Sequence, residues 1–166
     1  NLAAANHFIP RDVNIATDGA LTLTGSLKGT LKAIDPDLVV TVENGLILSP
    51  DLAPGFSKIT MRARIDNGEA NVEQLTANWG AASLDASARL PLEVVPPLPV
   101  EIPRMGGPAM VKAAIKGLDL SALPGAPARL DGTISLDADV SADRPDLAAL
   151  SGKITFSELD LAFGGL

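Results

Sequence analysis

The 166-residue chain contains no cysteine and no tyrosine, and it has only one tryptophan, four phenylalanines and one histidine. Because cysteine is absent, thiolate metal sites, thiol nucleophiles and disulfide bonds are excluded. A β-sandwich of this size usually carries several Tyr or Trp residues between its two sheets. With an aromatic content of 3%, this chain lacks such a filling, so its apolar surfaces are aliphatic and thin.

Long apolar runs are missing as well. No run approaches the roughly 20 residues of a membrane-spanning helix, and residues 1–10 lack the basic start and apolar stretch of a signal peptide. The chain begins at Asn1 and ends just after an expected strand, so we expect an internal segment of a longer protein whose membrane anchor lies elsewhere. The net charge of −7 disfavours binding to nucleic acid.

What the chain does contain is strict alternation of apolar and polar residues. In Leu130–Ala142, every even position is apolar or Gly, and every odd position is Asp, Thr or Ser. Since the side chains of a strand point alternately to opposite faces, this stretch predicts one long strand with one apolar side. Ser57–Asp66 and Ala82–Leu90 alternate in the same way. We therefore expect an all-β fold with long strands and very little helix.

Turn-forming residues predict where these strands connect. Asp18-Gly19 and Asn67-Gly68 are two-residue hairpin signals between alternating stretches. Asp35-Pro36-Asp37 is expected to break a strand, because Pro lacks the amide donor of a central ladder. Glu43-Asn44-Gly45 is expected to form a further turn. Together these signals predict a series of antiparallel hairpins.

Some stretches interrupt the alternation. The apolar positions change phase near Glu73-Gln74 and near Ser157-Glu158, which predicts a β-bulge at each place. Ala109–Leu118 fits both a helical and a strand spacing. We favour the strand, followed by a short helical turn at Ser121–Leu123.

Several stretches share a cadence of an alternating strand with Gly, a loop in which Leu follows Pro, and a second alternating strand. They are Leu130–Val140, Arg144–Leu147, Leu150–Phe156, Leu23–Leu31 with Asp35–Leu38, and Gly117–Leu123. This cadence covers most of the chain. It resembles the repeats of the TamB (translocation and assembly module) branch of the AsmA-like proteins.

The resemblance implies a fold and a function. The fold would be an elongated, mostly antiparallel twisted sheet, curled into an open hydrophobic groove (a β-taco) in the periplasm of a diderm bacterium. The function would be phospholipid transfer between the inner and outer membranes, with help in outer-membrane protein assembly. An inner-membrane anchor, and a region that binds an outer-membrane assembly-type barrel protein, would lie outside this sequence, so anchoring and docking are not carried over.

The residues expected to line the groove are apolar members of the alternating stretches. They are Ile59, Met61, Ile65, Val72, Leu84, Leu130, Ile134, Leu136, Val140, Ile154 and Phe156. Their ligands would be phospholipid acyl chains, because each methylene removed from water is worth about 0.8 kcal/mol. The alternative is a structural or adhesive β-solenoid, in which the same residues pack against one another and bind no lipid. A connected, exposed apolar surface would favour the groove.

A proline-rich stretch divides the chain. Six prolines between residues 91 and 108 forbid a central strand there, so this stretch is expected to be an extended linker or a sheet edge. The expected organisation is a groove segment of repeated hairpins at residues 1–90, the linker at residues 91–108, and a second groove segment at residues 109–166.

No group of residues predicts catalysis, a cofactor or a metal site. Asp131, Asp137 and Asp139 spread along one polar face in strand register instead of converging in a loop. His7 has no local partner for acid-base or nucleophilic chemistry. Trp79 lies at a strand end, where we expect it to pack on a neighbouring turn, with lipid contact as the alternative. We therefore expect a protein that is not an enzyme.

Overall fold

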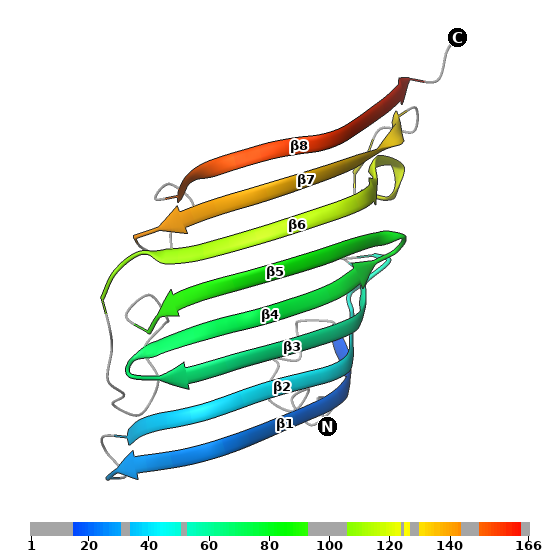
Figure 1. Cartoon of the computed structure of the whole chain (residues 1–166). Coiled ribbons are helices and arrows are strands. Elements are labelled where there is room, and N and C mark those ends of the chain that lie inside the picture. The colour runs from blue at the N-terminus through cyan, green and yellow to red at the C-terminus, as the bar shows by residue number, and fades with distance from the viewer. Residues whose placement is uncertain are drawn as a thin grey trace.

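The computed structural model describes residues 15–30, 34–50, 53–92, 106–123, 125–126, 130–143 and 150–163 (Figure 1). Its strands are β1 (Ala16–Gly29), β2 (Ile34–Leu48), β3 (Phe56–Asp66), β4 (Glu69–Trp79), β5 (Ala82–Pro91), β6 (Ala109–Asp119), β7 (Leu130–Ala142) and β8 (Leu150–Phe163). A short 3-10 turn, η3 (Leu120–Ala122), follows β6.

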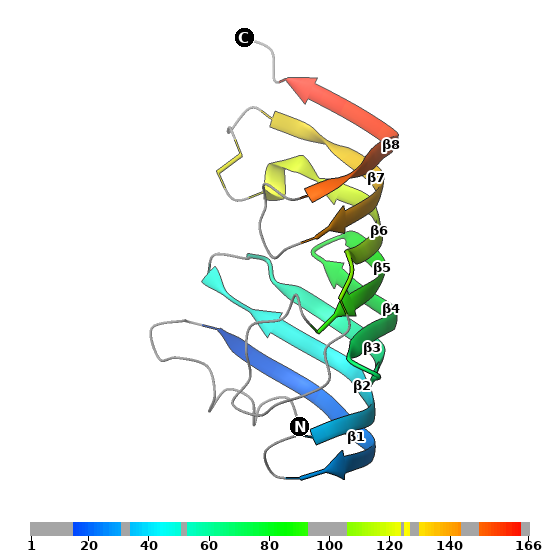
Figure 2. The same cartoon turned by 90° about the vertical axis from the view of Figure 1, so that its left-hand side faces the viewer.

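The eight strands form one sheet in chain order, from β1 at one edge to β8 at the other. Every pair of neighbours is antiparallel. Figures 1 and 2 show β1 and β8 at opposite ends of the sheet, so the sheet does not close on itself. The prediction of an all-β, antiparallel, open and curled sheet is confirmed, and its described part contains no α-helix.

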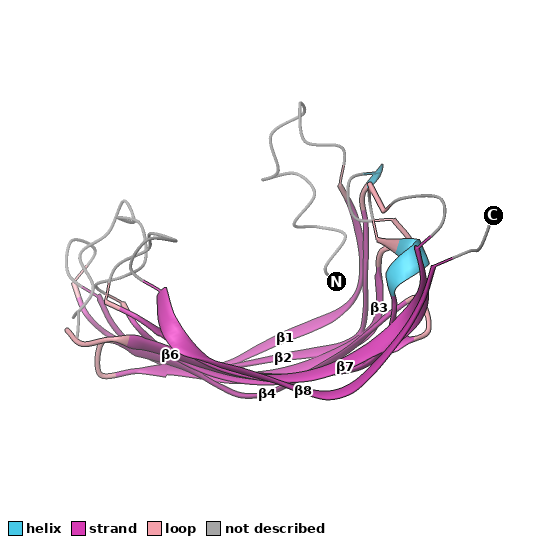
Figure 3. Ribbon diagram, turned by 90° about the horizontal axis from the view of Figure 1, so that it is seen from above, coloured by secondary structure: helices cyan, strands magenta, loops and turns pink. Residues whose placement is uncertain are grey.

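The sheet is bent across its strands. Figure 3 looks down the stack of strands and shows both ends of the strands curving to the same side, so the sheet forms an open trough. Ladder irregularities lie near the bend on both sides of the sheet, at Asp18/Ala20 in β1, Val42/Gly45 in β2, Ser57/Thr60 in β3, Ile115/Leu118 in β6 and Ser135/Leu136 where β7 meets β8, whereas the ladder between β5 and β6 is regular. Because each bulge bends its strand, these irregularities help the sheet to fold.

A buried hydroxyl ties three strands together at this bend. The side chain of Ser135 in β7 is 6% exposed. Its Oγ accepts a hydrogen bond from the backbone N–H of Gly117 at 3.0 Å and donates one to the carboxylate of Glu158 at 3.2 Å. The bulges of β6 and β8 are therefore held by one residue of the strand between them.

Two of the predicted turns belong to the bend instead. Asp18-Gly19 lies within β1 and Asn44-Gly45 within β2, and the two dipeptides face each other across the ladder. Gly19 has φ +123°, and a β-carbon there would lie 2.8 Å from Cα of Gly45. Asp-Gly and Asn-Gly usually form hairpin turns, but in this sheet they allow two long paired strands to bend together. The predicted hairpin at Asp18-Gly19 and the predicted turn at Glu43-Asn44-Gly45 are therefore wrong.

The predicted break at Asp35-Pro36-Asp37 is wrong as well, because β2 runs through it. Pro36 pairs with Leu27 of β1, whereas the ladder between β2 and β3 begins at Leu38. Pro36 thus lies where β2 has a neighbouring strand on one side only. Because β3 does not extend to Pro36, the missing N–H of this proline removes no ladder hydrogen bond on the β3 side of β2.

The other local predictions are confirmed. Asn67-Gly68 forms the turn between β3 and β4, with positive φ angles of 48° and 77°. The ladder skips Glu73-Gln74 between β4 and β5, and it is irregular at Ser157-Glu158 in β8. Ala109–Leu118 is part of strand β6, and the short helical turn is η3, which begins one residue before the expected Ser121.

The strands on either side of the proline-rich stretch belong to one sheet, because β5 pairs directly with β6. Pro91 is the last residue of β5 and pairs with Glu69. Residues 93–105, which hold most of the proposed linker, lie outside the described residues, and so does His7.

The packing is that of a single layer. Among the described residues, no side chain is completely buried. The best-packed apolar cluster consists of Val42, Ile59 and Ala77, on or beside the bend, where Ile47, Phe56, Met61, Leu75 and Leu84 pack against it. Bending brings side chains on the inner surface closer together, so this thin sheet obtains its main apolar burial there.

Candidate functional site

The ladders keep apolar side chains on one side of the whole sheet. Successive register partners form a row of Leu21, Val42, Met61, Leu75, Ala86, Ala113, Ala138 and Ile154. The row beside it holds Leu23, Val40, Ala63, Val72, Ala88, Val111, Val140 and Gly152. Each row crosses every strand without meeting a charged or polar residue. At about 4.8 Å between strands, a row is about 34 Å long.

Further rows widen this surface on both sides. Leu38, Ile65, Ala70 and Leu90 continue it in β2 to β5. Beyond the two long rows, Leu84, Ile115, Leu136 and Phe156 follow the bend, and Leu118, Ile134 and Leu159 lie one row further. We call the surface formed by all these rows the apolar face.

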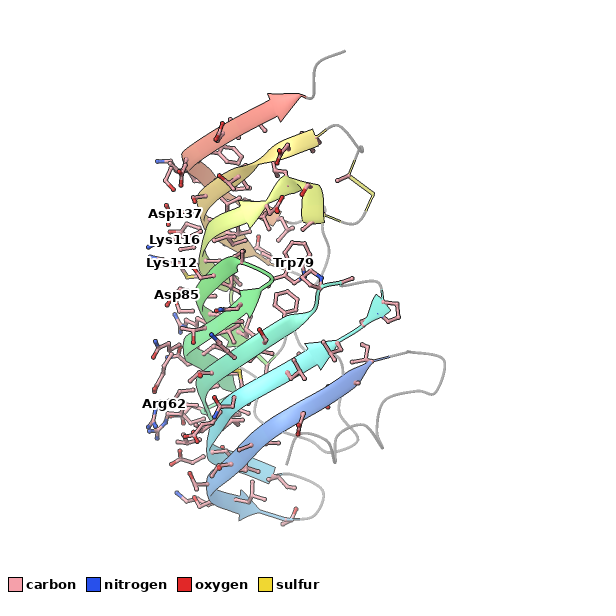
Figure 4. All side chains as sticks on the ribbon, turned by 90° about the vertical axis from the view of Figure 1, so that its right-hand side faces the viewer. Arg62, Trp79, Asp85, Lys112, Lys116 and Asp137 are labelled. Carbon is pink, nitrogen blue, oxygen red and sulfur yellow. The ribbon has the colours of Figure 1, made fainter. Side chains whose placement is uncertain are left out.

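The opposite surface is polar, and the two surfaces lie on different sides of the bend. Figure 4 shows Arg62, Asp85, Lys112, Lys116 and Asp137 projecting from the outer side of the curved sheet, whereas Trp79 lies within the curve. The concave side is therefore the apolar face, and the convex side meets water.

Ion pairs lie along the convex side, and all of them except the pair of Arg64 with Asp66, both in β3, join neighbouring strands. They join Arg62 to Glu73 at 2.8 Å, Arg64 to Asp37 at 3.0 Å and to Asp66 at 3.1 Å, Arg89 to Glu69 at 2.6 Å, and Lys112 to Asp139 at 3.6 Å. Because most of these side chains are well exposed, each pair contributes little to stability, and its main effect is to keep this side hydrated.

Two charged groups have shifted pKa values, and both shifts are local. The pKa of Arg64 is raised by its hydrogen bond to Asp66 and by the charge of Asp37. The pKa of Asp119 is lowered because its carboxylate accepts hydrogen bonds from Oγ of Ser121 at 2.7 Å and from the Ser121 N–H at 2.8 Å. The first group fastens β2 to β3, and the second caps η3, so neither shift indicates acid-base chemistry.

Exposure on the apolar face is greatest on the edge strands. Leu23 and Leu27 of β1 are 60% and 62% exposed, and Ile154, Phe156 and Leu159 of β8 are 56–58% exposed. No second layer covers these side chains among the described residues. Contiguous apolar exposure of this kind is rare on soluble monomers and usually marks a binding surface.

The structure places the predicted groove residues on this one face. Met61, Val72, Val140 and Ile154 belong to the two long rows, Leu84, Leu136 and Phe156 to the bend row, and Ile65 and Ile134 to the outer rows. Ile59 pairs with Gly45 at the bend, and Leu130 pairs with Phe163 at the start of β7. The eleven residues lie on five of the eight strands: β3, β4, β5, β7 and β8.

Sequence reasoning missed other members of the apolar face. Leu21, Leu23 and Leu27 alternate clearly in β1, and that signal was sufficient to include them. Phe56 and Leu118 could not be found in this way, because a ladder irregularity puts each of them out of phase with the alternating residues of its own strand.

A hollow of about 150 Å³ lies on the apolar face where β3, β4, β5 and β6 meet near the β4–β5 turn. Its lining residues are Phe56, Trp79, Ala82, Ser83, Leu84, Ile115 and Leu118, and all of the lining surface is apolar. Two other hollows, of about 330 and 470 Å³, lie among charged residues such as Asp85, Lys112 and Lys116. Those two are gaps between side chains on the convex side, so we expect water in them.

Within the described residues, no group of three or more His, Cys, Asp or Glu side chains could hold a metal ion. Asp131, Asp137 and Asp139 lie at alternate positions of the convex side of β7. The described part of the chain also contains no helix that is long and apolar enough to span a membrane.

No family model, curated protein or solved structure matches this chain.

Proposed function

We propose that this chain shields phospholipid acyl chains on its apolar face and carries lipid between the inner and outer membranes of a diderm bacterium. The protein would act in the periplasm, held at the inner membrane by a segment outside this sequence. The observation that carries the proposal is the apolar face itself, which is concave, uninterrupted over about 34 Å, and uncovered among the described residues.

The energy of acyl-chain transfer supports this proposal. About 15 methylenes at about 0.8 kcal/mol each make the exposure of one acyl chain to water cost about 12 kcal/mol. A trough that covers half of the surface of the acyl chain removes about half of that penalty, or about 6 kcal/mol. The contact is non-directional, so it holds no particular lipid tightly and allows the lipid to leave at the other membrane.

The dimensions of the face also support it. The hydrocarbon core of a bilayer is about 30 Å thick, so an acyl chain in one leaflet spans about 15 Å. One chain is therefore about half as long as the apolar face. It can lie on the face along its whole length and move from strand to strand without meeting a charge.

The alternative of a structural or adhesive β-solenoid is less well supported. A solenoid stacks repeats that bury a shared interior, whereas Leu23, Leu27 and Ile154 each keep more than half of their surface exposed. The strands also form one antiparallel sheet in chain order. A role in outer-membrane protein assembly, with a barrel protein bound through regions outside this sequence, is a second part of the proposal and rests on the resemblance alone.

Lipid extraction and native mass spectrometry of the full-length protein test the proposal. We expect phospholipid to co-purify with the native protein and to be lost when Val111→Asp and Ile154→Asp are combined on the apolar face. The matched control combines Met110→Asp and Ser151→Asp, which lie on the convex side of the same strands and whose register partners, Arg89 and Ser141, carry no negative charge. Recovery of a folded native protein without phospholipid would contradict the proposed function.

A further inference from the structure

The 150 Å³ hollow differs from the rest of the apolar face in shape and in lining. Phe56 and Trp79 are register partners on β3 and β4, and Trp79 pairs in turn with Ala82 on β5. Leu84 and Ile115 also line the hollow, and they pair with each other in the row that follows the bend. Two aromatic rings therefore lie side by side at one end of a face whose other side chains are aliphatic except Phe156.

We propose that this hollow is a subsite that holds about six carbons of one phospholipid acyl chain. This inference rests on the proposed function of the apolar face and names the place where a chain is held during transfer. The remainder of the chain would lie along the rows of the face, in contact with side chains that do not fix its position.

The size of the hollow fits such a segment. An apolar cavity of about 150 Å³ lined by Leu, Ile and Phe stays dry and binds benzene, a six-carbon ligand. The hollow here has a similar volume but is open to solvent on one side, and Ala82 and Ser83 border it beside the Phe, Trp, Leu and Ile side chains. An apolar occupant removes this apolar lining from water, so it is favoured over a polar one.

The lining also distinguishes an acyl chain from a peptide. Ser83 borders the hollow, but its register partners Asn78 and Lys116 belong to the convex side, so its hydroxyl points away. A peptide in the hollow would bring N–H and C=O groups that find no partner on an apolar surface. An acyl chain brings no such group.

The hollow is held in shape by the strands and by the turn beside it. Leu118 is followed directly by Asp119, whose carboxylate caps η3 through two hydrogen bonds from Ser121. Trp79 lies within the curve of the sheet, at the end of β4 (Figure 4). A site formed before its ligand arrives loses less entropy on binding.

Fluorescence of Trp79, the only tryptophan of this chain, tests the subsite directly. The probe is phosphatidylcholine with bromine at one of several positions along an acyl chain, loaded onto the protein from vesicles, with Trp79→Phe as the background. Bromine quenches indole emission only at close range. We expect one bromine position to quench Trp79 more strongly than the others, because a seated segment keeps a fixed distance from the ring.

Two variants in which Leu replaces Ala provide the matched comparison. Ala82→Leu fills the hollow, whereas Ala142→Leu adds the same atoms to the apolar face at the far end of β7. We expect Ala82→Leu to remove the position dependence and Ala142→Leu to retain it. If Ala82→Leu does not fold, Leu118→Ala enlarges the hollow instead and should change which bromine position quenches most strongly.

The outcomes separate the subsite from the proposed function. Equal quenching by all bromine positions, or unchanged position dependence in folded Ala82→Leu and Leu118→Ala, would overturn the subsite while lipid still binds the apolar face. An absence of quenching together with an absence of co-purifying phospholipid would overturn both.

Discussion

Replacing Ile154 by Asp distinguishes an open apolar face from an ordinary core. Ile154 is 58% exposed, so only about 42% of its surface is removed from water. Complete burial of an Ile side chain stabilises a fold by about 1.5–3 kcal/mol, which scales here to about 0.6–1.3 kcal/mol. The lower strand propensity of Asp adds at most about 1 kcal/mol. We therefore expect Ile154→Asp to lower the free energy of unfolding by about 1–2 kcal/mol.

The same change should weaken lipid binding by a similar or somewhat larger free energy. A carboxylate on the face must stay hydrated, so it displaces the two or three methylenes that would lie on it. At about 0.8 kcal/mol each, their loss weakens binding by about 1.6–2.4 kcal/mol, or about 15- to 50-fold.

Urea denaturation followed by circular dichroism measures the first effect, and partition of a fluorescent phospholipid onto the protein measures the second. Ser151→Asp is the matched control, because Ser151 lies on the convex side of the same strand and its register partner Ser141 is uncharged. The control should change neither quantity substantially. A loss of more than about 3 kcal/mol in Ile154→Asp would mean that the face is covered in solution, and undiminished lipid binding would mean that lipid does not use β8.

Three further substitutions test the packing that shapes the face. Val42→Asp puts a charge on a side chain that is 6% exposed, so it should cost more than about 4 kcal/mol and abolish the β-sheet signal in circular dichroism. Ser135→Ala leaves the Gly117 N–H without its acceptor and should cost about 1–3 kcal/mol in urea denaturation, most of which Ser135→Thr should restore. Gly132→Ala should cost about 1–3 kcal/mol and accelerate amide exchange in β8 first, because its β-carbon would overlap the carbonyl oxygen of Asp160. Unchanged stability in any of the three would contradict the packing described for that site.

Alternation of apolar and polar residues was sufficient to predict the strands and most of their inner side. Leu130–Ala142 became one strand, as expected, because a period of two admits no helix. The errors came from local signals with two meanings. Gly19 and Asn44 adopt the positive φ angles of a hairpin turn, but the same angles also serve a bend within paired strands.

The concave shape and the hollow could not be predicted from the sequence. Which side of a sheet becomes concave depends on where the bulges of separate strands align, as Gly117 and Glu158 do around Ser135. Phe56 and Leu118 are distant in the chain and meet only through the register of the strands between them. Such register is a property of the whole sheet, and no short window of sequence contains it.

The central claim is that the inner side of this sheet contacts lipid and the outer side does not. A photo-reactive benzoylphenylalanine placed at Phe156 or at Thr155 in the full-length protein, followed by irradiation of intact cells, tests it most directly. Phe156 lies on the apolar face beside Leu136, and Thr155 lies on the convex side opposite Asp137. We predict phospholipid adducts at position 156 and none at position 155; adducts at both positions, or at neither in a folded protein, would contradict the account.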